Sequence, residues 1–204
     1  PSGPSRRTFL AFVGGVAGLT VAIGGLGVGL ARKASDLAAE RLRIALPSVA
    51  AKLQAPRPGP EVEAPVSDGT AFITPNEDFY RIDTALQVPA ISVEEWSLRI
   101  HGMVDREIEL SWQDLNDRMA MERIITLTCV SNEIGGSLAG NATWTGFPIR
   151  DLLDEVGVRP GVDMLLSTSA DGWTSGTPIA ALTDGRDAML AVGMNGDDEL
   201  NGVS

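Results

Sequence analysis

The chain has 204 residues but only one cysteine, one histidine and one tyrosine. A lone cysteine cannot form an internal disulfide, and it cannot supply the several thiolates of a zinc or iron–sulfur site. The sequence also lacks a G-x-G-x-x-G stretch, a P-loop and a haem-attachment motif, which are the usual signals of nucleotide or covalent haem binding. We therefore expect no haem, no iron–sulfur cluster and no zinc.

Basic residues are scarce after residue 60. Residues 61–204 carry eight Arg or Lys against twenty-five Asp or Glu, whereas residues 1–60 carry eight against two. The strong negative charge of residues 61–204 argues against nucleic acid or anionic lipid as a partner of this part of the chain. The balance fits a solvated domain outside a membrane, with the basic segment at the membrane.

Charge is absent altogether from residues 8–31, a run of 24 residues with seven glycines. A helix rises about 1.5 Å per residue, so this run is long enough to cross a hydrocarbon core of ~30 Å. Arg6 and Arg7 precede the run, and Arg32 and Lys33 follow it. We predict one N-terminal transmembrane helix in the cell membrane.

The residues at the start of this run, Ser5-Arg6-Arg7-Thr8-Phe9-Leu10, resemble the twin-arginine export signal. The alternative is that the two arginines form only a positive membrane flank. No A-x-A cleavage site follows the run. We therefore predict a retained anchor with the main domain on the extracytoplasmic side.

The rest of the chain divides into a spacer and a domain. Residues 34–46 have the pattern of an amphipathic helix, and the prolines that follow, as far as Pro65, favour an extended tether. Residues 1–33 are thus interpreted as signal and anchor, residues 34–66 as juxtamembrane helix and linker, and residues 67–204 as the main domain.

The main domain is predicted to mix short strands and helices. Alternation over residues 96–100 indicates a half-buried strand, and the β-branched content of residues 123–129 indicates a buried one. Ser111 is a predicted helix cap, and a second helix is predicted from Pro148 to Gly157. Further strands are predicted at residues 107–110, 164–167 and 188–192. Their irregular order favours an α+β fold over a doubly wound sheet.

Cys129 lies where the predicted strand 123–129 runs into a polar, Gly-rich stretch, residues 131–140. One interpretation is that Cys129 fills the core, because cysteine is among the most commonly buried residues. The other is that it binds a metal, because a soft thiolate selects soft or high-valent centres. A single thiolate suffices when an organic cofactor supplies the other ligands.

Several stretches resemble, in the same order, the sulfite-oxidase-type molybdopterin-binding oxidoreductase family, including its bacterial membrane-associated and periplasmic members. They are Asn76-Glu77-Asp78-Phe79-Tyr80-Arg81, Thr128-Cys129-Val130, residues 144–153 (WTGFPIRDLL), residues 169–175 (SADGWTS) and residues 193–196 (GMNG). The resemblance extends from about residue 74 to residue 200. It implies the sulfite-oxidase-like molybdopterin-binding fold.

The resemblance also implies a site. In that family a cysteine thiolate binds molybdenum and a pterin dithiolene supplies two more sulfurs, so Cys129 is the expected metal ligand and catalytic residue. The expected cofactor-binding residues are Glu77, Asp78, Tyr80, Arg81, Asn132, Thr168 and Ser169. Arg81 suits a phosphate, although it could equally form a surface salt bridge. Asn132 could bond near the metal or hold its own loop. Trp144 and Phe147 are assigned to packing, and His101, remote from the motifs, to no catalytic role.

The implied activity is molybdenum-dependent oxygen-atom transfer to or from a small sulfur- or nitrogen-containing substrate, with a separate electron carrier. Sulfite oxidisers of the family carry Cys-x-Gly-Asn-Arg, whereas Glu133 stands here in place of the arginine. A carboxylate disfavours a dianion, so a neutral S-oxide or N-oxide is as good a candidate as sulfite. The family's later H/N-G-x-P-x-R stretch is not found after Asn195-Gly196, and we interpret the domain as C-terminally truncated.

Two other classes of function stay open at this stage. One is a cofactor-free, membrane-tethered binding module with the same fold. The other is a thiol-based redox sensor, which would need Cys129 to be exposed and to have a low pKa.

The export signal can be tested by replacing Arg6 and Arg7 with lysines, which keeps the charge and removes the motif. We expect export of the following domain, measured as its fraction outside the cytoplasm, to fall sharply. Unchanged export would mean that the two residues are only a positive flank.

Overall fold

The computed structural model describes residues 29, 36, 39–40, 44–62, 71–82, 89 and 91–196. The predicted signal and anchor therefore lie outside the described residues, except for Gly29. Within the described ranges there is no helix with the length and apolar character needed to span a bilayer. Asp36, Ala39 and Glu40 are helical, but residues 44–48 are not. The helix predicted over 34–46 thus ends earlier, because the residue before a proline, here Leu46 before Pro47, disfavours helical geometry.

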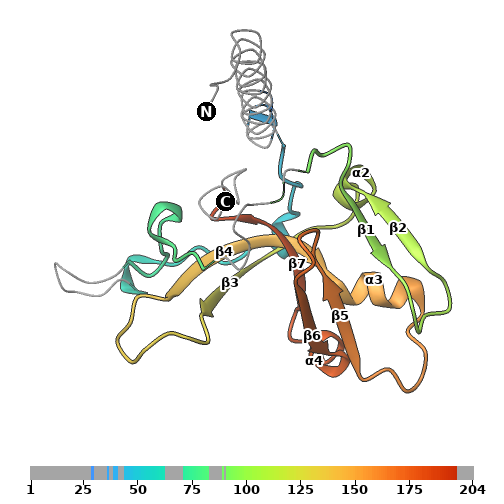
Figure 1. Cartoon of the computed structure of the whole chain (residues 1–204). Helices are drawn as coiled ribbons and strands as arrows, with labels where there is room; N and C mark the ends of the chain where they lie inside the picture. Colours follow the sequence, from blue (N-terminus) through green and yellow to red (C-terminus); the bar gives the residue numbers. More distant parts are fainter. Residues whose placement is uncertain are drawn as a thin grey trace, which may run out of the picture.

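The centre of the domain is an antiparallel sheet of three strands in the order β3-β4-β7 (Figure 1). Its strands are β3 (Met121–Thr128), β4 (Ala139–Pro148) and β7 (Met189–Met194). The sequence analysis predicted the outer two and missed β4, whose glycines and Asn141 have low strand propensity. The register between β4 and β7 shifts between Thr145 and Gly146.

In the described part of the domain, two hairpins and three short helices accompany this sheet, which confirms the predicted mixture of helices and strands. The hairpins are β1 (Ser97–Ile100) with β2 (Ile108–Ser111), and β5 (Met164–Thr168) with β6 (Thr174–Pro178). The helices are α2 (Trp112–Asn116), α3 (Ile149–Val156) and α4 (Ile179–Thr183). Three 3₁₀ turns are η1 (Ala51–Leu53), η2 (Pro60–Val62) and η3 (Asn76–Asp78). The strand β6 was not predicted, because the sequence TSGTP reads as a loop.

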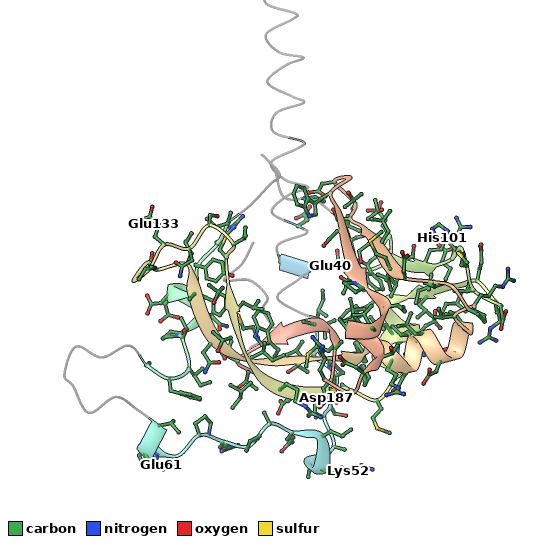
Figure 2. The ribbon with its side chains drawn as sticks, turned by 90° about the horizontal axis from the view of Figure 1, so that it is seen from below. Glu40, Lys52, Glu61, His101, Glu133 and Asp187 are labelled. Carbon is green, nitrogen blue, oxygen red and sulfur yellow. The ribbon has the colours of Figure 1, made fainter. Side chains whose placement is uncertain are left out.

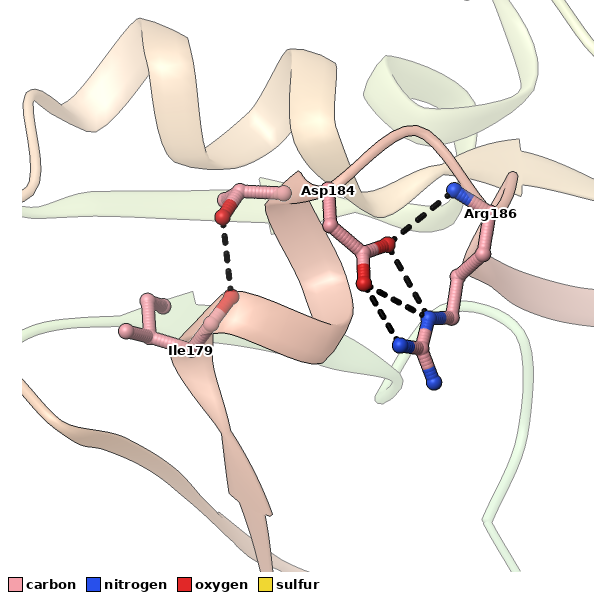
Figure 3. Close-up of polar contacts among 4 residues, drawn as sticks. Ile179, Asp184 and Arg186 are labelled. Atoms are coloured by element: carbon pink, nitrogen blue, oxygen red, sulfur yellow. Dashed lines mark hydrogen bonds and ion pairs between the residues drawn. The ribbon is translucent and has the colours of Figure 1, made fainter.

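The helix boundaries follow the expected local rules. Ser111 and Asp114 form a reciprocal capping box at the start of α2, and Gly157 ends α3 in the left-handed conformation with φ 68°. At the end of α4 the Thr183 hydroxyl donates to the Ile179 carbonyl at 3.0 Å (Figure 3). Asp184 accepts hydrogen bonds from Arg186, but an exposed ion pair of this kind adds little stability.

Two groups of buried side chains form clusters in the core of the described part of the domain. The first, around the fully buried Leu115 and Phe147, joins the sheet to the helices and to the β1–β2 hairpin; its buried members are Leu110, Leu115, Ala120, Phe147 and Leu152. The second, which we call the aromatic cluster, contains Phe79, Ala142, Trp144 and Met194. Trp144 and Phe147 are both buried, so their assignment to packing is confirmed.

Part of the predicted linker packs against the edge of β3. Val49 forms a parallel bridge with Ala120, and the Ala55 amide donates to a carboxylate oxygen of Glu122 at 3.2 Å. The Arg123 guanidinium donates to the carbonyl of Leu53 at 3.4 Å. Figure 2 shows Lys52 and Glu61, which lie on this segment, on the side of the molecule away from Glu133. Residues 49–55 therefore pack as part of the domain rather than as a free tether.

The close approach of β4 and β7 can be tested at Gly146. A Cβ atom at this position would clash with the carbonyl oxygen of Leu190 and the Cα of Ala191 in β7. Because backbone cannot move aside as a side chain can, we expect Gly146→Ala to lower the free energy of unfolding by about 1–3 kcal/mol in chemical denaturation.

Gly176 provides the matched control. A Cβ atom there would meet the end of the Met164 side chain, which is exposed and free to rotate. Gly176→Ala should leave the free energy of unfolding nearly unchanged. Equal losses in the two variants would show that backbone contact between β4 and β7 is not what requires glycine at residue 146.

Candidate functional site

Cys129 is the first residue after β3, at the end of the β3–β4 hairpin. Its amide donates to the carbonyl of Leu138 at 2.9 Å, which continues the ladder of the two strands by one bond. The residue is half-buried and belongs to neither hydrophobic cluster. Cys129 is therefore not a core residue. The hairpin presents its thiol from a fixed backbone position.

The loop after Cys129 is held together by Asn132. The Asn132 amide donates to the Cys129 carbonyl at 3.0 Å, and its side-chain oxygen accepts from the Leu138 amide at 2.8 Å. A Cβ atom on Gly136 would lie 2.7 Å from that same oxygen, so glycine is needed there. Asn132 thus holds its own loop, and its other predicted role, a bond near the metal, stays a prediction.

The surroundings of Cys129 favour its thiolate form. The Ser131 hydroxyl lies 3.2 Å from Cys129 Sγ. This side-chain hydrogen bond is the main reason that the pKa of Cys129 is lowered, and bonds from the backbone amides of Ser131 and Val130 add to the effect while partial burial opposes it. A thiol with a lowered pKa is the better nucleophile and metal ligand at neutral pH.

A second segment, residues 71–82, also contributes to the site and precedes the strands of the sheet in the sequence. Phe79 is buried and lies over Gly140 of β4, where a Cβ atom would be 2.5 Å from its ring. Tyr80 stacks on Phe79 with ring centroids 5.4 Å apart, and Trp144 meets Phe79 edge-on at 5.7 Å. Through these aromatic contacts, the aromatic cluster holds the segment on the sheet.

Tyr80 and Cys129 lie close enough to interact electrostatically. Burial raises the pKa of Tyr80, and the negative charge of the Cys129 thiolate raises that pKa further. The structure therefore brings together two of the predicted site residues, which are 49 positions apart in the chain. Glu77 and Asp78 on η3 and Arg81 after Tyr80 belong to the same segment, and all three side chains are exposed.

Thr168 and Ser169 lie at the end of β5, as predicted, but in a different sheet from Cys129. The Ser169 hydroxyl donates to the Asp171 carboxylate, and the Ser169 amide donates to the Trp173 carbonyl at 2.9 Å. Within the part of the chain that the structure describes, no hydrogen bond or ion pair joins either residue to the Cys129 loop. Their share in the site stays a prediction.

His101 follows β1 and is exposed. Figure 2 shows His101 and Glu133, which lies on the Cys129 loop, at opposite ends of the molecule. The histidine therefore lies far from the candidate site.

Sequence reasoning missed the asparagines that fix residues 71–82 to the sheet. Asn141 accepts a bond from the Thr74 amide and donates to the Phe72 carbonyl at the upstream end of the segment, and Asn195 donates to the side-chain oxygen of Asn76. The signals in the sequence are the places of Asn76 and Asn195 in two of the resembling motifs, and the Asn195-Gly196 pair, which is typical of a turn. Among the described residues, no group of three or more His, Cys, Asp or Glu is placed to hold a metal ion.

Comparison with known proteins identifies the relatives of this chain. The family model described as "Oxidoreductase molybdopterin binding domain" matches residues 85–200, more than half of the chain. The chain is 30% identical to the mitochondrial sulfite oxidase of Drosophila melanogaster over 155 residues, which cover 64% of this chain and 26% of that protein. It is 31% identical to the NADPH nitrate reductase of Mycosarcoma maydis over 112 residues, which cover 45% of this chain and 11% of that protein.

Two bacterial proteins are also similar. The uncharacterized oxidoreductase YuiH of Bacillus subtilis is 24% identical over 135 residues, which cover 64% of this chain and 66% of YuiH. The crystal structure of the sulfane dehydrogenase SoxCD from Paracoccus pantotrophus is 24% identical, with a TM-score of 0.47 and coverage of 52% of this chain and 31% of that one. The chain thus spans less than two thirds of each of these proteins.

The proximity of Tyr80 to Cys129 can be tested without any cofactor. Tyr80 is the only tyrosine, so absorbance near 295 nm during an alkaline titration reports its ionisation alone. The pKa of Cys129 is lowered, so the thiolate is charged when Tyr80 titrates and disfavours the phenolate. Cys129→Ala should therefore lower the pKa of Tyr80.

Glu133→Gln is the control, because it removes another negative charge from the same loop without touching the Cys129 thiol. We expect this variant to leave the pKa of Tyr80 unchanged. If Cys129→Ala also leaves it unchanged, residues 71–82 do not lie beside the cysteine.

Proposed function

Because the chain belongs to the oxidoreductase molybdopterin-binding domain family, we propose that Cys129 binds the molybdenum of a molybdopterin cofactor. The protein would then be a molybdenum-dependent oxidoreductase of the sulfite oxidase type. The observation that carries the proposal is the accessible thiol with a lowered pKa at the end of a rigid hairpin. Sulfite oxidase and nitrate reductase are among its relatives.

The residues present fit such a cofactor. Among the described residues no cluster of His, Cys, Asp or Glu is placed to hold a metal ion, and one soft thiolate suits a metal whose remaining ligands come from an organic group. The loop after Cys129 is tied by its own hydrogen bonds, so binding would not have to order it. The bound cofactor would supply two-electron oxygen-atom transfer, and the chain would supply placement and charge.

Residues 71–82 would hold the pterin part. Tyr80 lies near Cys129 and would offer its phenolic hydroxyl as a hydrogen-bond donor. Arg81 would bind the phosphate, because a guanidinium matches phosphate oxygens with two parallel bonds. Glu77, Asp78, Thr168 and Ser169 are proposed as further cofactor contacts from the resemblance of their motifs.

The substrate would be a small sulfur- or nitrogen-containing compound without a strong negative charge. Residues 130–138 contain no Arg or Lys, and the exposed Glu133 lies within this loop. A carboxylate on the same loop as the thiol would repel a dianion such as sulfite, whereas a neutral S-oxide or N-oxide would meet no such repulsion. Electrons would pass to or from a separate carrier.

We also propose that the domain works outside the cytoplasmic membrane. The support is the twin-arginine-like Ser5-Arg6-Arg7-Thr8-Phe9-Leu10 stretch, the uncharged run over residues 8–31 and the acidic balance of residues 61–204. Such a run would keep the domain at the membrane surface.

A second candidate is a thiol-based redox sensor. The accessible Cys129, with its lowered pKa, meets the requirement for a reactive thiol. Metal analysis separates the two candidates, because a sensor would be active without molybdenum.

The proposal is tested by metal and pterin analysis of the full-length protein purified from a host that makes the cofactor. We expect the wild type to hold molybdenum and pterin. Cys129→Ser should lose turnover and should retain no more than about a tenth of the molybdenum that the wild type holds, because a hydroxyl is a poor substitute for a soft thiolate.

His101→Ala is the control, because it also changes the only residue of its type in the chain, but at an exposed position far from the site. It should keep the wild-type molybdenum content, and both variants should keep the wild-type far-UV circular dichroism. Normal molybdenum content and turnover in Cys129→Ser would contradict the proposed role of the thiol.

A further inference from the structure

Asn195, the first residue after β7, connects three parts of the domain. Its backbone amide donates to the Thr143 carbonyl of β4 at 2.7 Å, and its side-chain oxygen accepts from the Thr143 amide at 3.0 Å. Its side-chain nitrogen donates to the Thr74 carbonyl at 2.9 Å and to the side-chain oxygen of Asn76 at 2.7 Å. One amide group thus joins β7, β4 and residues 74–76.

The backbone of Asn195 adopts a conformation that few residues tolerate. Its φ of 56° is left-handed, and only one other non-glycine residue in the described part of the chain, Asp187, has a positive φ. Asparagine is among the side chains best suited to this region. The conformation aims the side-chain amide at Thr74 and Asn76 while the main chain stays paired with β4.

The residues that Asn195 holds lead directly to the candidate site. Asn76 begins η3, and its own side chain donates to the Met194 carbonyl at 3.4 Å. Three residues later Phe79 packs in the aromatic cluster with Met194, and Tyr80 follows. The path from Asn195 to Tyr80 is therefore short and consists of hydrogen bonds and buried contacts.

A second asparagine holds the upstream end of the same segment. The Asn141 side chain donates to the Phe72 carbonyl at 2.8 Å, and its backbone exchanges bonds with Thr74. Asn141 thus anchors residues 72–74 on β4, whereas Asn195 anchors Thr74 and Asn76, next to η3. Loss of Asn195 would release the part of the segment that precedes Tyr80 and leave its upstream end attached.

We propose that Asn195 is a positioning residue for the cofactor site. It holds residues 74–80 against β4 and β7, where Phe79 packs in the aromatic cluster and Tyr80 stacks on Phe79. The inference rests on the proposed function only in taking the ligand of the site to be the cofactor. That Asn195 fixes residues 74–80 follows from the hydrogen bonds and packing contacts alone.

The first test is hydrogen–deuterium exchange of the full chain, followed peptide by peptide by mass spectrometry. Asn195→Gly removes the side chain and keeps the left-handed backbone favourable. We expect exchange in peptides from residues 71–82 to rise by about fivefold or more, because two side-chain hydrogen bonds to this segment are lost. Peptides from β1, β2 and α3 should exchange at the wild-type rate.

Two further variants sharpen this test. Asn195→Asp keeps an acceptor for the Thr143 amide but has no donor for Thr74 and Asn76, so it should loosen residues 71–82 as the glycine variant does. Asp187→Gly is the control, because Asp187 is also left-handed but pairs with Arg123, at the other end of β7. Figure 2 shows Asp187 well away from Glu133 on the Cys129 loop. This variant should leave exchange in residues 71–82 unchanged.

The second readout is molybdopterin content after purification. We expect Asn195→Gly to retain at least about tenfold less cofactor than the wild type, and Asp187→Gly to retain the wild-type amount. Unchanged exchange in residues 71–82 of Asn195→Gly would overturn the inference, and so would an equal rise in all peptides. Wild-type cofactor content in a variant with a loosened segment would also overturn it. A wild-type protein without molybdopterin would contradict the proposed function, whereas a failed exchange result contradicts the role of Asn195 alone.

Discussion

The pairing of β3 with β4 is the interaction on which the candidate site depends. The two strands match residue for residue from Met121 opposite Gly146 to Thr128 opposite Ala139. This register places Cys129 at the end of the ladder and fixes its backbone against Leu138. It also places Gly140 on the surface that receives Phe79. A shift of one residue would turn both features to the opposite face.

The aromatic cluster links this hairpin to the rest of the site. Phe79 needs the space left by Gly140, and it packs with Trp144 of β4 and Met194 of β7. Trp144 is itself fixed by a hydrogen bond from its indole nitrogen to the Ile125 carbonyl of β3, 3.1 Å long. Buried side chains in rigid contact transmit small displacements, so the position of Tyr80 depends on all three strands.

Features set by local chemistry could be predicted from the sequence. The cap at Ser111, the end of α3 at Gly157 and the strand leading to Cys129 all follow from residues within one turn or one strand. The strand β4 could not, because its glycines are explained only by neighbours such as Phe79 and Leu190. The role of Asn195 depends on Thr74 and Asn76, about 120 residues earlier, and no local pattern shows such a contact. The motif resemblance indicated Cys129 and Tyr80, which the fold brings together, as well as Thr168 and Ser169, which lie on a separate hairpin.

The central claim is that the Cys129 thiolate is a ligand of molybdenum. X-ray absorption at the molybdenum edge measures it most directly, because sulfur and oxygen neighbours scatter differently. The wild-type protein should show one more sulfur neighbour than Cys129→Ser protein that has been loaded with cofactor. The same number of sulfur neighbours in both proteins would contradict the account.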